Sequence, residues 1–111
     1  KRQNFVLSEE SSNYKWNIKT KEFTLGSFDS KKQILTICLE LNSKSRVRVI
    51  FSEKSKILAS FFIEKSDFTN EMDYIKIPCF FHDVSTLQIE LKAEKEFSLG
   101  RVNIYYTELL K

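Results

Sequence analysis

Apolar and polar residues alternate along most of this chain. In the segment 87–92, for example, Leu87, Ile89 and Leu91 are each separated by one polar residue. Successive side chains of a β-strand point to opposite faces of the sheet, so this spacing buries one face and leaves the other in water. A helix would need apolar residues three and four positions apart, which is not the spacing found here. The pattern therefore predicts an all-β protein.

Eight segments carry this alternation and are predicted to be strands, namely 14–19, 23–25, 34–41, 46–52, 57–63, 75–77, 87–92 and 102–107. Polar stretches separate them at intervals typical of antiparallel sandwiches and barrels. The turns contain no Asn-Gly or Asp-Gly pair, so tight two-residue hairpins are not expected to be the rule. We therefore predict an antiparallel two-sheet β-sandwich of jelly-roll or Greek-key topology with about eight strands.

The alternation also assigns residues to faces. In the segment 34–41 it places Leu35, Ile37 and Leu39 on one face and their neighbours on the other. Consecutive aromatic residues at 61–62, 80–81 and 105–106 must put one ring on each face of the sheet. The apolar residues expected on outer faces are Ile34, Ile50, Phe62 and Tyr105.

The length of 111 residues suits one compact domain, and a hydrophobic fraction of 41% is that of an ordinary globular protein. We expect residues 1–111 to form a single β-sandwich domain that is a fragment or accessory module of a larger protein. No apolar run approaches the ~20 residues of a membrane-spanning helix, so no transmembrane segment is predicted.

Composition excludes some functions. With only 2 glycines, the chain has no Gly-rich phosphate-binding loop, and a net charge of +3 with interleaved signs makes nucleic acid an unlikely partner. The richest basic stretch, 44–56, is interpreted as a solvated strand with its turns, and an anion-facing patch is the alternative. An oligonucleotide-binding barrel using Arg46, Arg48 and Phe51 is a minor hypothesis.

Residues for catalysis are scarce. The single histidine, His82, is followed by Asp83, and adjacent side chains diverge too much to orient one another as in a triad. Cys38 and Cys79 lie in apolar runs and suit small buried residues, although a disulfide between them stays possible. We predict a non-enzymatic protein with no catalytic residues, no bound metal and no cofactor.

Aromatic side chains are the remaining chemical resource, because a flat exposed ring can stack on the apolar face of a sugar. Trp16, flanked by Tyr14, is the first candidate, followed by Tyr74. With Arg48 from the basic stretch, these residues form the predicted ligand-binding set. The alternative for Trp16 is a place in the core, since it lies on an alternating strand.

The order of segments from Asp29 onward resembles the galactose-binding-like, carbohydrate-binding jelly rolls. The likeness is carried by KKQILTICLEL, SRVRVIFSEKSKILASFFIEK, MDYIKIPCFFHDVSTLQIELKAE and the closing LGRVNIYYTEL. Members of that family often carry an acidic residue in the last strand, where this chain has Asn103, so a structural calcium ion is left open. They also often carry two or more tryptophans, and this chain has only Trp16.

The resemblance implies a non-catalytic carbohydrate-binding accessory module whose aromatic residues stack on a glycan or polysaccharide. The alternative is a structural or oligomerisation β-sandwich domain attached to a glycosyltransferase or other envelope enzyme. Its partner would then be a catalytic domain in the same chain or a second copy of the module. Fold likeness alone does not choose between these functions.

Overall fold

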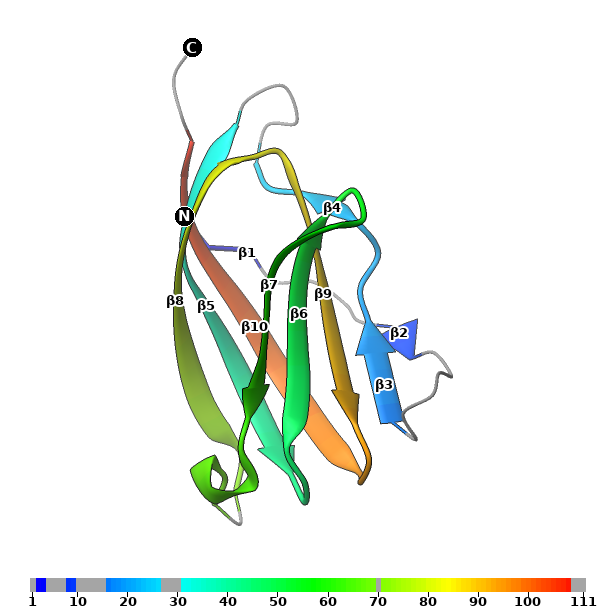
Figure 1. The fold of residues 1–111 in the computed structure, drawn as a ribbon. Coiled ribbons are helices and arrows are strands. Elements are labelled where there is room, and N and C mark those ends of the chain that lie inside the picture. Colours follow the sequence, from blue (N-terminus) through cyan, green and yellow to red (C-terminus); the bar gives the residue numbers. More distant parts are fainter. Residues whose placement is uncertain (1, 4–7, 10–15, 27–30, 70, 109–111) are drawn as a thin grey trace.

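The chain folds as two antiparallel sheets packed face to face (Figure 1). The computed structural model describes residues 2–3, 8–9, 16–26, 31–69 and 71–108, and no α-helix occurs among them. One 3-10 turn, η1 (Lys65–Asp67), follows the strand that ends at Ile63. The predicted all-β, two-sheet sandwich is confirmed.

The four-stranded sheet has the order β1 (Arg2–Gln3), β10 (Phe97–Glu108), β5 (Lys32–Ser43) and β8 (Asp73–Val84). The six-stranded sheet has the order β2 (Ser8–Glu9), β3 (Trp16–Lys19), β9 (Thr86–Ala93), β6 (Val47–Glu53) and β7 (Lys56–Ile63), and β4 (Phe23–Thr24) also pairs with β9. Connections therefore cross repeatedly between the sheets, as the absence of hairpin signals suggests. β7 and β8 are edge strands of their sheets, and both lie on the same side of the sandwich.

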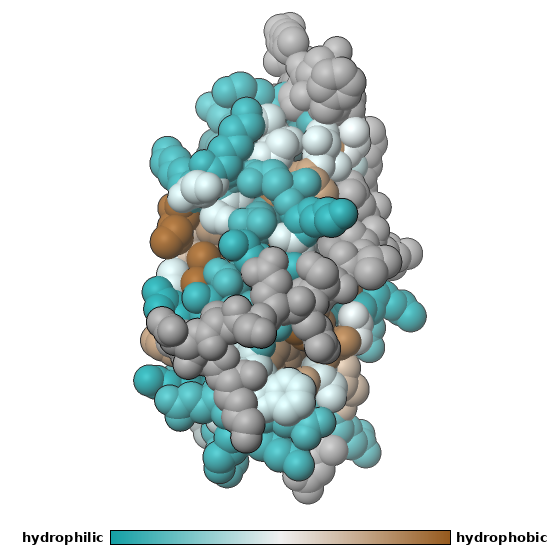
Figure 2. Space-filling view, turned by 90° about the vertical axis from the view of Figure 1, so that its right-hand side faces the viewer, coloured by the Kyte–Doolittle hydropathy of each residue, from teal (hydrophilic) through white to brown (hydrophobic). Residues whose placement is uncertain are grey.

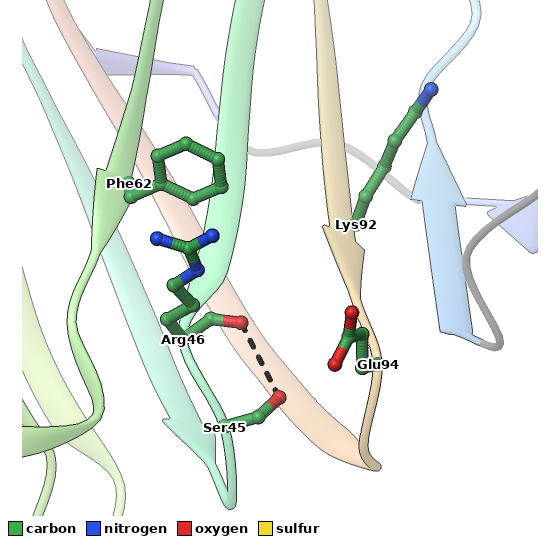
Figure 3. A pocket seen from close by; sticks show the side chains of 5 residues that line it. All are labelled: Ser45, Arg46, Phe62, Lys92 and Glu94. Atoms are coloured by element: carbon green, nitrogen blue, oxygen red, sulfur yellow. Dashed lines mark hydrogen bonds between the residues drawn. The ribbon is translucent and has the colours of Figure 1, made fainter.

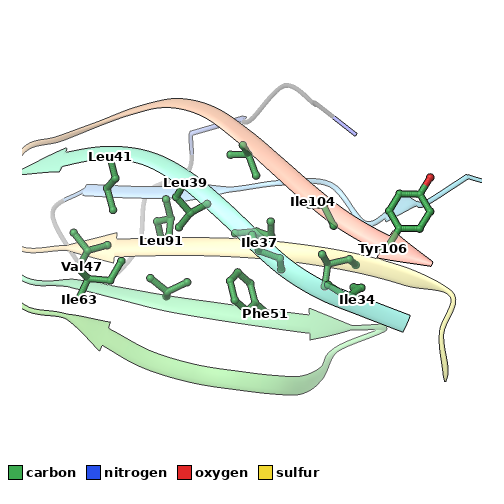
Figure 4. Packing of buried hydrophobic residues seen from close by; sticks show 14 of the residues in the cluster. Ile34, Ile37, Leu39, Leu41, Val47, Phe51, Ile63, Leu91, Ile104 and Tyr106 are labelled. Carbon is green, nitrogen blue, oxygen red and sulfur yellow. The ribbon is translucent and has the colours of Figure 1, made fainter. Parts of the chain in front are cut away.

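The core lies between the two sheets and is built from one face of the longer strands β5 to β10 (Figure 4). In β9 the predicted alternation is confirmed, because Leu87, Ile89 and Leu91 are at most 1% exposed. Near the β7–β8 side the Phe51 ring meets the rings of Phe61 and Phe81 edge-on, with centroids 5.8 and 6.1 Å away. These contacts join the two sheets, since Phe51 and Phe61 belong to one and Phe81 to the other.

A bulge in β5 overturns one predicted face. Tyr105 and Tyr106 of β10 pair with Thr36 and Ile34, so Leu35 is an extra residue with no partner on β10. An extra residue shifts the alternation by one position. Ile34, predicted to face outward, is therefore fully buried in the core, whereas Leu35 is only partly buried.

The faces predicted for the consecutive aromatic pairs and for Ile50 agree with the structure. Within each consecutive aromatic pair, Phe61, Phe81 and Tyr106 pack against the core, while their neighbours Phe62, Phe80 and Tyr105 are 42%, 65% and 38% exposed. Ile50 lies outside the core cluster, as predicted, but is only 9% exposed.

The β6–β7 connection is a tight two-residue hairpin, an exception to the predicted rule. Glu53 pairs with Lys56, so Lys54 and Ser55 form a two-residue turn, with φ angles of 48° and 70°. Positive φ at both central positions is the requirement of a type I′ turn, which glycine and asparagine meet best. Tertiary pairing of the strands has imposed the turn on two residues that disfavour it.

Replacing Lys54 and Ser55 by Asn-Gly should raise the free energy of unfolding by about 1 kcal/mol, because both positions then suit positive φ. Urea denaturation followed by circular dichroism measures the change. The matched control places Asn-Gly at Lys95–Glu96, a turn without positive φ, where no gain is expected. Equal changes in stability at both turns would contradict the assignment of a type I′ turn to Lys54 and Ser55.

The Glu53 carboxylate fastens the β8–β9 turn to the end of β6. Its Oε2 accepts hydrogen bonds from the Ser85 amide at 2.8 Å and the Ser85 hydroxyl at 2.9 Å, and the Thr86 amide lies at 3.4 Å. Partial burial acts to raise the pKa of Glu53, but these hydrogen bonds and the charge of Lys54 outweigh it and lower the pKa below the usual range of a glutamate.

Glu53→Gln should therefore lower stability at neutral pH by on the order of 1 kcal/mol, a value that allows for solvent screening at this partly exposed site. Since folding lowers this pKa, the carboxylate stabilises the fold above its unfolded pKa, and the stabilisation is lost as pH falls through the folded pKa. Urea midpoints from pH 7 to pH 3 should converge for the two proteins. Glu96→Gln, at an exposed turn position, is the control; a constant difference across the range would contradict this role.

Candidate functional site

The predicted ligand-binding residues lie on different faces of the sandwich. Trp16 stands opposite Ala93 in the β3–β9 pairing and packs, half-buried, against the core, which is the alternative that the sequence left open. Arg48 lies on the outer face of the six-stranded sheet, and Tyr74 on the outer face of the four-stranded sheet. Tyr14 falls outside the described residues. The structure does not bring Trp16, Arg48 and Tyr74 together.

Tyr74 lies flat on the outer face of its sheet. It belongs to β8, and its hydroxyl accepts a hydrogen bond from Asn103 Nδ2 of β10 at 3.4 Å. Because β5 runs between these two strands, the side chain must extend along the sheet to reach β10, over a strand separation of roughly 10 Å. The ring therefore lies over β5 and is 51% exposed.

Two buried residues lie beneath this ring. Cys38 and Asn103 pair across β5 and β10 and point away from the core, yet they are 0% and 3% exposed. Asn103 Oδ1 is buried and has no hydrogen-bond partner among the described residues. A buried acceptor without a partner costs about 1–3 kcal/mol, and such groups are rare enough to mark a place of interest.

The Tyr74 hydroxyl is fixed by several polar neighbours. Its interaction with the Cys38 side chain is the largest influence, and together with desolvation and the Tyr105 side chain it raises the pKa of Tyr74 to about 12. Hydrogen bonding from Asn103 acts in the opposite direction. Tyr74 therefore stays a neutral phenol at physiological pH, and the hydrogen bond from Asn103 anchors its hydroxyl.

Polar and charged groups surround the ring. Glu40 of β5 stands opposite Tyr74, and its Oε1 lies 3.5 Å from Arg101 Nε of β10. Tyr105, 38% exposed, continues the aromatic surface on β10. We call Tyr74, Tyr105, Glu40 and Arg101, with Asn103 beneath them, the tyrosine surface. It offers one flat apolar ring bordered by hydrogen-bonding groups of both signs.

The two cysteines are free thiols. Cys38 lies on the outer face under Tyr74, whereas Cys79 is on the core side of β8, where its thiol donates to the Ile77 carbonyl at 3.3 Å. Burial is the main cause that raises the pKa of Cys79 to about 11, so this thiol is a poor nucleophile at neutral pH. The disulfide that the sequence left possible is not formed.

His82 is exposed on β8, with its Nε2 3.3 Å from Gln33 Nε2. Within the described ranges, no group of three or more His, Cys, Asp or Glu side chains gathers in a way that could hold a metal ion. In the same part of the chain, no helix has the length and apolar character needed to cross a membrane.

The side of the sandwich near β2 and β3 has a different character. Hydrophilic side chains dominate its described part, and the hydrophobic side chains visible there form small separate groups (Figure 2). The large exposed hydrophobic residues, including Tyr74 and Phe80, come from other elements, chiefly β7, β8 and β10.

Comparison with protein-family models and with curated proteins found no match for this chain. Tyr74 belongs to the predicted ligand-binding set and Tyr105 to the predicted outer face, whereas the sequence does not predict Asn103 as a binding residue. The only signal for Asn103 was a polar residue within an apolar strand, and many solvated positions share that signal.

If the Tyr74 ring covers Cys38, Tyr74→Ala should speed the alkylation of Cys38 by iodoacetamide at least tenfold, because removing the ring exposes the thiol. Tyr74→Phe keeps the ring and should keep most of the protection. Mass spectrometry of tryptic peptides under native conditions follows Cys38 and Cys79 separately, and Cys79 is the internal control. Equal acceleration of both thiols would indicate general unfolding and contradict the local cover.

Proposed function

We propose that this protein is a non-catalytic carbohydrate-binding module and that the tyrosine surface is its glycan-binding site. The observation that carries the proposal is the Tyr74 ring, which lies along the sheet, half exposed, with its hydroxyl fixed by neighbours. A sugar ring presents slightly positive C–H groups on one face, and an aromatic ring presents a negative face to them.

The fixed orientation supports binding in a second way. A side chain that is already immobile loses little conformational freedom when a ligand stacks on it, so more of the stacking energy remains as affinity. Tyrosine is suited to this use because it supplies a large rigid surface with few rotatable bonds.

The rim of the surface supplies groups that match sugar hydroxyls. A hydroxyl both donates and accepts hydrogen bonds, and the adjacent Glu40 and Arg101 offer an acceptor and a donor. Their ion pair is exposed, with side-chain exposures of 35% and 64%, so a ligand can replace part of it at small cost.

The strand order supports the resemblance to galactose-binding-like jelly rolls. Each sheet interleaves early and late strands, β1-β10-β5-β8 and β3-β9-β6-β7, which is the arrangement of two wound Greek keys in a jelly roll. We propose that this topology is a jelly roll and that the domain serves as an accessory module. Topology by itself names no ligand, so the glycan proposal rests on Tyr74.

The alternative function is a structural or oligomerisation domain. It is favoured by the exposed apolar residues Ile57 and Phe80, at 58% and 65%, on the two strands that end the sheets. Unpaired sheet edges with apolar side chains nearby are common sites of association. The occupant would be a second copy or a catalytic domain in the same protein.

Binding is tested with a glycan array, followed by calorimetry with the saccharide that binds best. Tyr74→Ala should weaken binding about tenfold, because an aromatic contact contributes roughly 0.5–1.5 kcal/mol beyond buried area. Tyr74→Phe keeps the stacking face and should stay within about threefold of the parent protein. Phe80→Ala, which removes an exposed ring elsewhere on β8, is the matched control and should change nothing.

A folded protein that binds no glycan across a broad panel would remove the proposal, as would unchanged affinity of Tyr74→Ala. Circular dichroism of each variant establishes folding. Sedimentation of the same samples addresses the alternative: dimers without glycan affinity would favour the oligomerisation domain.

A further inference from the structure

A small pocket lies on the outer face of the six-stranded sheet, on the opposite side of the sandwich from Tyr74 (Figure 3). Its volume is about 120 Å³, and it is lined by Ser45, Arg46, Phe62, Lys92 and Glu94. A pocket of this size accommodates one polar group of a ligand and the atoms next to it. It is too small for a whole oligosaccharide.

Strand register brings these side chains together. Arg48 of β6 stands opposite both Phe62 of β7 and Lys92 of β9, so the three form one row across the outer face. Arg46 lies two positions before Arg48, and Glu94 lies two positions after Lys92; both line the same pocket. Residues separated by almost fifty positions thus meet where β6 begins and β9 ends.

Arg46 is held in position while its hydrogen-bonding groups stay available. Its guanidinium carbon lies 4.2 Å from the centroid of the Phe62 ring, a cation–π contact that restrains an otherwise flexible side chain. No described carboxylate lies within ion-pair distance of Arg46. The guanidinium cannot lose its proton, so it keeps its positive charge and its N–H donors at every physiological pH.

The other groups narrow the chemistry of the ligand. Lys92 Nζ pairs with Glu90 at 3.6 Å, and its side chain extends away from Arg46 (Figure 3). Arg48 Nε donates to the Ser60 hydroxyl at 3.2 Å. The Ser45 hydroxyl donates to the Arg46 carbonyl at 3.3 Å and accepts from the Lys95 amide at 3.2 Å. Arg46 as donor and Glu94 as acceptor are therefore the groups left for a ligand.

We propose that this pocket binds a hydroxy-carboxylate, such as the acidic end of a uronic acid sugar. The carboxylate accepts hydrogen bonds from Arg46, and a neighbouring hydroxyl of the same ligand donates to Glu94. A bare oxyanion would satisfy Arg46 but would be repelled by Glu94, and a neutral sugar would leave the guanidinium without an anion. This inference does not depend on the tyrosine surface, which lies on the other sheet.

The test is a titration of ¹⁵N-labelled protein with glucuronate, followed by two-dimensional NMR. Shifts should concentrate at residues 45–48, 62 and 92–94, and the affinity should fall as ionic strength rises. Glucose, acetate and inorganic sulfate are titrated in parallel as neutral sugar, carboxylate without hydroxyls and bare oxyanion. Glucuronate should bind more tightly than all three. Sulfate or acetate binding equally well would overturn the hydroxyl part of the proposal.

Variants identify the two contacts. Arg46→Gln should weaken glucuronate binding at least tenfold, because a charge-assisted hydrogen bond is lost. Glu94→Ala should abolish the preference for glucuronate over acetate; if Glu94 only repels anions, both ligands would instead bind more tightly and the preference would remain. Arg101→Gln, an exposed arginine on the other sheet, is the control. Unchanged binding by a folded Arg46→Gln protein would refute the proposal.

The proposals for the two sites can be refuted independently of each other. Tyr74→Ala should leave the glucuronate shifts at residues 45–48 intact, and Arg46→Gln should leave binding at the tyrosine surface intact. Loss of glucuronate binding in Tyr74→Ala would contradict an independent pocket.

Discussion

Burial of one apolar face from each of two sheets is the constraint on which this structure depends. It fixes the direction of the side chains in the described strands, since a strand residue that does not point into the core points out of the sandwich. Both surfaces proposed for binding consist of the outward positions that this rule leaves. Tyr74 and Asn103 lie outside one sheet because Ile75 and Ile104 lie inside it, and Arg48 lies outside the other because Val49 is buried.

The same constraint explains why much of the fold was predictable. In β9 each apolar residue is separated by a single polar one, so its inner face is evident from the sequence. Two features of the fold could not be predicted from the sequence, because they depend on pairing between strands. The bulge at Leu35 reverses the faces at the start of β5, and strand pairing forces Lys54 and Ser55 into positive φ. Neither leaves a local signature, since the energy that imposes them comes from contacts elsewhere.

The candidate sites were less predictable for a related reason. Tyr74 is one of four tyrosines in the sequence, and its value as a platform comes from a side chain that crosses β5 to meet Asn103. That contact joins residues 29 positions apart. Trp16, the most suggestive residue in the sequence, proves to pack against the core. Likewise, the contact between Arg46 and Phe62 requires the register of β6 and β7, which composition does not contain.

The position of Pro78 has a consequence for how the edge of the four-stranded sheet can pair with other chains. It lies in β8, the last strand of its sheet, and Phe80 and Asp83 in the same strand have φ angles of 54° and 56°. A proline removes one amide donor, and residues with positive φ bend the backbone away from a straight ladder. An incoming chain would meet a discontinuous row of hydrogen-bonding groups and would pair with β8 less well than with a regular edge strand. Association of another protein at this border would therefore rely on the apolar side chains of β8 more than on added strand pairing.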